Sequence, residues 1–207
     1  MALIEMETVL CSHCKKKSEQ YVLLSNNYSN ERGLDSRPSK KAREDFRYDV
    51  QMCPHCFYCN DDISVGGEIN LGNDYMAIAK DNRIDEVSKK LLLAYKVRFA
   101  EKNYNEALQL LLEATWTLED NNSLFYSEIF ALLIKQLEAM VRIERDMDYE
   151  IVLIDLLRRS GSFDKALEYI DQIRSFDEEI IVALANYEEK LVKNGDTAHH
   201  LMEEIYG

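Results

Sequence analysis

Residues 103–116 read Asn103-Tyr-Asn-Glu-Ala-Leu-Gln-Leu-Leu-Leu-Glu-Ala-Thr-Trp116, and this stretch decides the fold class. Its apolar residues recur every three or four positions, which is the period of a helix that buries one face. They are Ala107, Leu108, Leu111 and Leu112. Asn103 with Glu106 three residues later predicts a capping box at the start of the helix.

The helical period continues on both sides of this stretch, from about Asp74 to the end of the chain. Further helices are expected at 85–101, 123–145, 149–160, 163–174 and 178–193, with a short last helix from Thr197. Gly161 and Gly195 follow two of these helices and are suited to left-handed C-terminal caps. Because the connections are short, consecutive helices are expected to lie antiparallel.

A second stretch, Ser162-Phe-Asp-Lys-Ala-Leu167, repeats the polar, aromatic, polar, polar, Ala, Leu order of residues 103–108. An aromatic residue followed by Ala-Leu is typical of the second helix of a tetratricopeptide-like hairpin. The distance between the two stretches is not a multiple of about 34 residues, so they are not regular tandem repeats. Two amphipathic helices with similar starts are the alternative interpretation.

The composition agrees with a folded and mainly helical protein. Of 207 residues, 46% are hydrophobic and 30% are charged, a mixture that can bury a core. The chain has 7 Gly and 2 Pro, too few for a sandwich or barrel with many tight turns.

The first third of the chain has a different pattern. Short β-like runs at 7–10, 20–24 and 47–52 are separated by polar turns, and residues 25–45 read as a long, mobile polar loop. We therefore expect two domains: a small zinc-ribbon-like β module at 1–65 that contains this loop, and a tetratricopeptide-like antiparallel helical array at 74–207.

The sharpest motif is a pair of CxxC sequences, Cys11-Ser-His-Cys14 and Cys53-Pro-His-Cys56. Two such knuckles facing each other complete the tetrahedral thiolate shell that Zn²⁺ prefers. Lys15, Lys16 and Lys17 favour thiolate over thiol beside the first pair. Since four protein ligands leave no open position for a substrate, the predicted zinc site is structural.

Several alternatives for this site stay open. The two pairs are separated by more than the about 15–20 residues of compact zinc ribbons, and the 25–45 loop accounts for the excess. Cys59, His13 or His55 could replace a ligand, iron could take the place of zinc, or the cysteines could be unrelated reduced thiols. Lys15 and Phe57 stand after the second Cys of each pair, where many knuckles have Gly.

Three stretches carry a family resemblance. They are Tyr48-Asp-Val-Gln-Met-Cys-Pro-His-Cys56-Phe-Tyr58, Glu106–Trp116 and Leu156-Leu-Arg-Arg-Ser-Gly-Ser-Phe-Asp-Lys-Ala-Leu167. Together they resemble the bacterial domain-of-unknown-function family numbered 2225, although Phe57 and Cys59 replace the family's usual Gly and Ala. The resemblance implies a zinc-ribbon-like N-terminus followed by tetratricopeptide-like helices, and it implies no established activity.

The charge is uneven along the chain. Residues 1–60 carry a net charge of +1 and residues 61–207 a net charge of −14, which leaves −13 for the whole. The C-terminal part is expected to repel nucleic acid and anionic lipid.

No convergent catalytic constellation is present, so the chain is expected not to be an enzyme. His199 and His200 precede Glu203 and Glu204 at a spacing that could hold a metal on a helix, but a solvated acidic face is the expected interpretation. Arg158 and Arg159 are expected to make surface salt bridges.

The function expected from these features is a non-catalytic scaffold whose helices bind a protein or peptide, favourably a basic one. The alternative is a nucleic-acid-binding zinc ribbon that uses a basic loop at 32–47 with Tyr28 and Phe46 for stacking. The basic residues of that loop are Arg32, Arg37, Lys40, Lys41, Arg43 and Arg47.

The sequence also bears on location. No apolar run approaches the about 20 residues that span a bilayer. Met1–Leu10 lacks the cationic start and long apolar core of a signal peptide. A cytoplasmic protein with no membrane partner is expected, and the sequence gives no oligomeric state.

Overall fold

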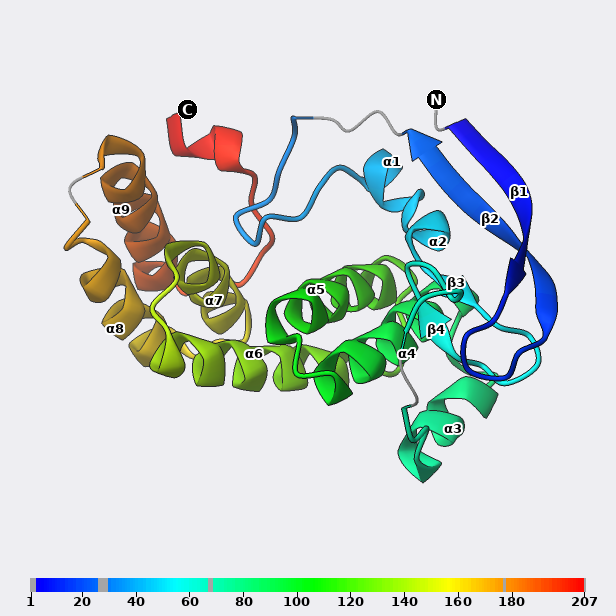
Figure 1. Ribbon diagram of the computed structural model, residues 1–207. Coiled ribbons are helices and arrows are strands. Elements are labelled where there is room, and N and C mark those ends of the chain that lie inside the picture. Colours follow the sequence, from blue (N-terminus) through cyan, green and yellow to red (C-terminus); the bar gives the residue numbers. More distant parts are fainter. Residues whose placement is uncertain (1–2, 26–29, 67–68, 177, 207) are drawn as a thin grey trace. The chain divides into compact units, whose positions relative to one another are not determined.

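The computed structural model describes residues 3–25, 30–66, 69–176 and 178–206. Within them the chain is mainly helical, with two small antiparallel β-hairpins followed by packed antiparallel helices (Figure 1). The predicted fold class is confirmed.

The first hairpin pairs β1 (Leu3–Leu10) with β2 (Lys17–Ser25), and the second pairs β3 (Gln51–Met52) with β4 (Cys59–Asn60). The strand predicted at 47–52 is wrong in its first half, where Phe46–Asp49 form the short helix α2. The Phe46 ring is buried and lies 6.3 Å from the Trp116 ring. Burial of this aromatic pair favours a helical turn over the strand that local propensity predicts.

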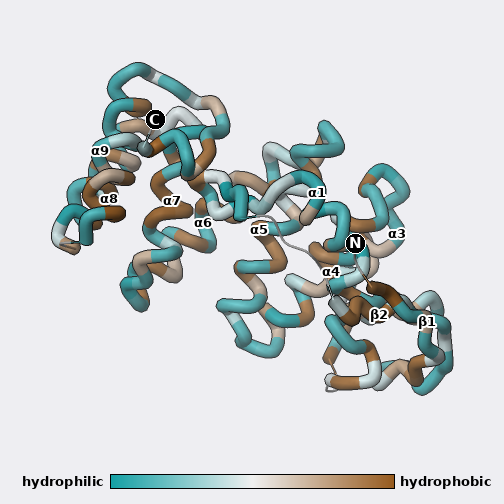
Figure 2. The backbone as a smooth tube through the Cα atoms, turned by 90° about the horizontal axis from the view of Figure 1, so that it is seen from above, coloured by the Kyte–Doolittle hydropathy of each residue, from teal (hydrophilic) through white to brown (hydrophobic). Residues whose placement is uncertain are grey.

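Helices account for most of the remaining chain. Short α1 (Lys40–Arg43) precedes α2, and the longer helices are α3 (Asn73–Lys80), α4 (Glu86–Ala100), α5 (Tyr104–Asp120), α6 (Tyr126–Ile143), α7 (Met147–Arg159), α8 (Phe163–Ile173) and α9 (Glu179–Lys193). Hydrophobic and hydrophilic residues alternate along α5, α7 and α8 (Figure 2), as expected for helices that bury one face. The last helix, predicted from Thr197, is a 3₁₀-helix at Met202–Tyr206.

Helices α4, α5, α7 and α9 end in the same way. A residue with positive φ follows each C-cap, and the next N–H bonds to a carbonyl five residues back. These residues are Lys102, Asn122, Gly161 and Gly195. The two Gly caps predicted from the sequence have this geometry, which is the Schellman motif.

The capping box predicted at Asn103 is wrong. The Asn103 side chain makes no capping hydrogen bond, and the Glu106 carboxylate lies 2.9 Å from the Arg98 guanidinium. A charge-assisted bond to Arg98 is stronger than a bond to a backbone N–H, so Glu106 turns toward the cation.

The chain divides into two compact units. The N-terminal unit comprises Met1–Tyr28 and Lys40–Leu133, and the C-terminal unit comprises Ser29–Ser39 and Ile134–Gly207. These limits describe compactness in the folded chain. The expected domains at 1–65 and 74–207 concern independent folding, and they stay a prediction.

The N-terminal unit holds both hairpins around α4 and α5. Its core includes Leu91, Leu93, Leu111 and Leu118, all fully buried. Helix α1 is fastened to the end of α5 by Arg43, whose Nε and a terminal nitrogen each lie 2.8 Å from an Asp120 carboxylate oxygen.

The expectation of a mobile loop at 25–45 is wrong for its described central part. Leu34 and Asp35 are 1% and 0% exposed, and Gly33 forms a β-bridge with Leu201 in the C-terminal unit. Figure 1 shows this segment beside the chain that follows α9. A Cβ on Gly33 would collide with the His199 ring and with Asp35, so the close approach requires glycine.

Arg158 is buried instead of making the expected surface salt bridges. Its guanidinium bonds the carboxylates of Asp155 at 2.5 Å and Glu188 at 2.8 Å, and it also bonds the carbonyls of Asp196 and Ala198. Arg159 pairs with Asp35 at 3.2 Å. Because buried charges need compensation, these arginines hold the C-terminal unit together.

Candidate metal centre

The four cysteines predicted as ligands come together in the N-terminal unit. Cys11 and Cys14 lie in the turn that joins β1 to β2, and Cys53 and Cys56 lie in the turn that joins β3 to β4. All four sulfur atoms lie within 4.8 Å of one another. The Cys11–Cys56 and Cys14–Cys53 sulfur pairs are 3.7 and 3.6 Å apart.

The two turns have the same backbone design. The Cys11 N–H donates to Lys16 O, and the Cys11 carbonyl accepts from the Lys15 N–H, each at 2.9 Å. Cys53 repeats both bonds with Tyr58 and Phe57 at the same distance. Lys15 and Phe57 have φ of 59° and 63°, a left-handed conformation that favours glycine. Both knuckles therefore form without the glycine that many others have.

The sulfur positions fit a tetrahedral metal ion. Zn–S bonds of about 2.3 Å place the sulfurs of a tetrahedral site about 3.8 Å apart. The Cys11–Cys56 and Cys14–Cys53 sulfur separations are close to this value. Cys11, Cys14, Cys53 and Cys56 would hold a zinc ion with no position left for a substrate, which is the arrangement of a structural site.

The thiols differ in their electrostatic surroundings. Burial raises the pKa of Cys53 and Cys56. Burial also acts on Cys14, but the Lys16 backbone and the neighbouring thiols outweigh it and lower the pKa of that thiol. A bound cation stabilises thiolates regardless of these differences.

The chain after β4 braces the centre. Ser12 N–H donates to Ile63 O at 2.7 Å, and the buried Tyr58 hydroxyl donates to Val65 O at 3.2 Å. A Cβ on Gly66 would overlap the Tyr58 hydroxyl, so this close approach also requires glycine.

The three alternative ligands lie outside the cluster of four sulfurs. Cys59 is buried, its N–H donates to the Tyr75 hydroxyl, and burial raises its thiol pKa. The His13 ring stacks on Tyr58 at 5.7 Å, and a ring nitrogen of His55 lies 3.2 Å from Lys17 O. Each therefore has a contact that packs or orients its side chain elsewhere.

The second metal hypothesis, at His199 and His200, has a different geometry from the one expected. His200 lies between carboxylates, with Glu204 at 2.9 Å and Asp196 at 3.2 Å. His199 faces Asp35 at 3.7 Å. These residues precede the 3₁₀-helix and join the ion pairs of the C-terminal unit instead of forming a solvated helical face.

The proposed basic loop at 32–47 is divided in the structure. Arg37 is buried beside Asp35, Arg43 is paired with Asp120, and Phe46 is covered by Trp116. Tyr28 lies outside the described residues. Of the residues predicted to contact nucleic acid, these three described ones are engaged within the protein.

Comparisons with protein-family models, curated proteins and solved structures gave no match. The four-cysteine cluster and the helical array are the parts of the family resemblance that the structure contains. Among the described residues, no helix has both the length and the apolar character needed to cross a membrane.

Proposed function

We propose that this protein is a non-catalytic interaction module that binds a basic segment of a partner protein. The observation that carries the proposal is an acidic recess on the N-terminal unit, formed by three hollows of about 240, 290 and 350 Å³ that share Asp61. The hollows lie against β1, β2, β3, α4 and α5.

The lining of the recess is strongly acidic. Its carboxylates are Glu7, Asp49, Asp61, Asp62, Glu106 and Glu113. Arg98 is the one cation among the described lining residues, and it is paired with Asp61 at 2.5 Å and Glu106 at 2.9 Å. A surface with this excess of negative charge attracts cationic segments and repels polyanions.

Apolar side chains on the first hairpin border the same recess. Leu10 and Tyr21 line it and are about half exposed. Apolar side chains that are exposed next to a cluster of negative charges are typical of surfaces that become buried in a complex. The recess therefore offers both the charge and the apolar contact that a peptide partner needs.

In this proposal the metal is zinc and its role is structural. The ion would join the turns of the two hairpins whose strands wall the recess. The centre would therefore fix the recess and take no part in chemistry.

The nucleic-acid alternative has less support. The acidic recess borders the first hairpin, and Arg37, Arg43 and Phe46 are engaged in internal contacts. Residues 61–207, with net charge −14, add to the repulsion of phosphates.

Site-specific photo-crosslinking in the protein's own cells tests the proposal. A photoreactive residue at exposed Thr8, in the recess, is compared with one at exposed Leu124. We expect position 8, and not position 124, to crosslink a protein through a segment of net positive charge. Crosslinks to RNA or DNA, or equal labelling from both positions, would contradict the proposal.

A further inference from the structure

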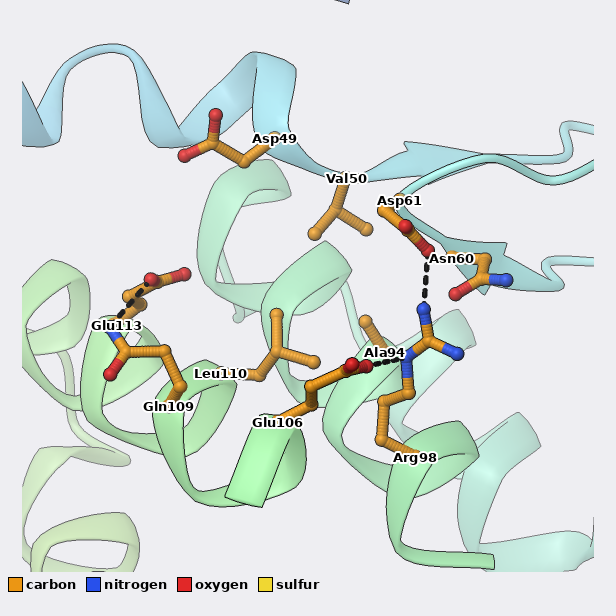
Figure 3. Close-up of a pocket in the computed structure, with 10 residues that line it drawn as sticks. All are labelled: Asp49, Val50, Asn60, Asp61, Ala94, Arg98, Glu106, Gln109, Leu110 and Glu113. Carbon is orange, nitrogen blue, oxygen red and sulfur yellow. Dashed lines mark hydrogen bonds and ion pairs between the residues drawn. The ribbon is translucent and has the colours of Figure 1, made fainter. Parts of the chain in front are cut away.

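One hollow of the recess, the pocket of about 290 Å³ in Figure 3, has features of a side-chain binding site. It lies between α2 and β4 on one side and α4 and α5 on the other. Its ten lining residues all belong to the N-terminal unit.

The charges in this pocket fall into two groups (Figure 3). At one end, Arg98 is held by Asp61 and Glu106. At the other end lie Asp49 and Glu113, and within the described chain neither carboxylate is paired with a cation. Glu113 accepts a hydrogen bond from Gln109 at 2.9 Å.

The Asp49 and Glu113 carboxylates are electrostatically unfavourable in the free protein. Burial raises the pKa of Glu113 to about 7, and the neighbouring Asp49 adds to the increase. Burial and Asp45 raise the pKa of Asp49 to about 6. A cation placed between these groups would relieve this cost.

A second observation points independently to a ligand. Asn60 is 2% exposed, and its side-chain oxygen has no hydrogen-bond partner. Its amide group donates to Val65 O at 3.2 Å, so the oxygen is left facing the pocket (Figure 3). A buried acceptor without a donor is costly, and a ligand N–H would satisfy it.

The rest of the pocket is apolar. Val50, Ala94 and Leu110 lie between the two charged ends (Figure 3), and Val50 and Ala94 are buried. This surface suits a short aliphatic chain. The pocket volume of about 290 Å³ leaves room for a single long side chain.

We propose that this pocket binds one arginine side chain of the partner, with its aliphatic part on Val50 and Leu110 and its guanidinium toward Asp49 and Glu113, while a main-chain N–H of the same segment faces Asn60 at the Arg98 end (Figure 3). The proposal rests on the proposed function, since it names the residue of the basic segment that the recess recognises. A guanidinium fits better than an ammonium because its planar set of five donors can serve the two carboxylates together.

The test uses the full-length ¹⁵N-labelled protein and N-acetyl-L-arginine amide as the probe, at pH 7.5 and low salt. We expect saturable chemical-shift changes at residues 49–50, 60–61 and 106–113. The N-acetyl-citrulline amide, which is neutral and nearly isosteric, should leave these amides unchanged. Equal binding of the citrulline compound, or no saturable change with the arginine compound, overturns the proposal.

Matched variants locate the binding. Asp49→Asn and Glu113→Gln should each weaken arginine-amide binding about tenfold or more, because each removes one charge-assisted bond. Glu128→Gln makes the same charge change at an exposed position on α6 and should alter affinity less than about twofold. Equal weakening by all three variants would show nonspecific attraction and overturn the proposal. Thermal unfolding checks that each variant is folded.

The pH dependence of binding and a Mg²⁺ control complete the test. Binding should weaken as the pH falls from 8 to 5, since Asp49 and Glu113, whose pKa values are raised to about 6 and about 7, become protonated. The other charged groups of the pocket are Arg98, Asp61 and Glu106, which are ion-paired with one another. Mg²⁺ that shifts the same amides more strongly than the arginine probe would make the pocket a metal site and overturn the proposal.

The outcome also separates this inference from the proposed function. A basic partner that crosslinks to position 8 but binds the Asp49→Asn and Glu113→Gln variants normally would leave the proposed function standing and overturn the arginine assignment. Arginine-amide binding without any protein crosslink would overturn the proposed function and leave the pocket's preference for arginine standing.

Discussion

Lys102 and Gly161 occupy equivalent positions after α4 and α7, with φ of 63° and 77°. A side chain in this conformation costs about 1 kcal/mol relative to glycine. Lys102→Gly should therefore stabilise the protein by about 0.5–1 kcal/mol, and Gly161→Ala should destabilise it by about 1 kcal/mol.

Urea unfolding followed by circular dichroism measures both changes. A Cβ on Gly161 would meet no atom within 4 Å, so a loss of stability there reports backbone conformation alone. Lys96→Gly, inside α4, is the control and should destabilise by about 1 kcal/mol. A destabilising Lys102→Gly would contradict the assignment of this cap.

The raised pKa values of Asp49 and Glu113 predict how the stability of the protein depends on pH. Their pKa values in the folded protein, about 6 and about 7, lie above those of unfolded chains. The folded state therefore binds protons more tightly, and stability should fall as the pH rises from about 4.5 to 8. At about 1.36 kcal/mol per pKa unit the two increases would amount to about 6 kcal/mol. Solvent screening of these half-buried carboxylates reduces the expected loss over this range to the order of 2 kcal/mol.

The Asp49→Asn, Glu113→Gln double variant should lack most of this decrease and be more stable than the natural protein at pH 8. Urea midpoints measured between pH 5 and 8 test this. An unchanged pH profile in the double variant would show that these two carboxylates are not the groups responsible.

The metal-binding residues could be predicted from the sequence because paired CxxC motifs carry their own geometry. The pocket between α2, β4, α4 and α5 could not be predicted, because Asp49, Asn60 and Glu113 are far apart in sequence and none of them stands out alone. The one local signal was Glu113 within the apolar run Leu110–Ala114, where a carboxylate faces burial. The partner of that carboxylate depends on tertiary packing.

At the scale of elements, long periodic helices were predicted to within a few residues, and short segments were not. Phe46–Asp49 is helical because Phe46 packs on Trp116. The centre of segment 30–39 is buried, where Asp35 meets Arg37 and Arg159. Both results depend on contacts between residues far apart in sequence. Phe46 and Trp116 are separated by 70 positions, and Asp35 and Arg159 by 124. Local propensity contains no record of such contacts.

Segment 30–39 should be released by a single change at Asp35. Burial alone would raise the pKa of Asp35, but His199, Arg37 and Arg159 lower it to about 2, so the carboxylate is ionised at neutral pH. Asp35→Asn removes the buried carboxylate charge that Arg37 and Arg159 face, at a cost of about 3–5 kcal/mol.

Limited trypsin digestion measures this release. Peptides ending at Arg32 should appear at least tenfold faster from Asp35→Asn than from the natural protein, because cleavage follows the population of the opened segment. Asp164→Asn, at an exposed position on α8, should leave the rate unchanged. Equal cleavage of Asp35→Asn and the natural protein would show that the segment is held by other contacts.

At the scale of the whole molecule, charge and compactness divide the chain differently. The change in charge near residue 60 suggests a boundary there. The compact units divide within α6 instead, and the segment Ser29–Ser39 belongs to the C-terminal unit. The hairpins and α4–α5 belong to one unit because Tyr58, Ile63 and Val50 are buried along with the helical core. The change in net charge near residue 60 reflects surface residues. The core includes apolar residues from before and after this position, so the charge does not mark its limit.

We infer that four thiolates hold one structural zinc ion, which fixes the two hairpins. Metal content and amide hydrogen exchange, measured together on the natural protein, Cys53→Ser and Cys59→Ser, test it most directly. We expect about one zinc per chain in the natural protein and in Cys59→Ser. Cys53→Ser should lose the zinc, with fast exchange at 3–25 and 50–66 and unchanged protection in α7, α8 and α9. Full zinc and protected hairpins in Cys53→Ser, or loss of metal in Cys59→Ser, would contradict it.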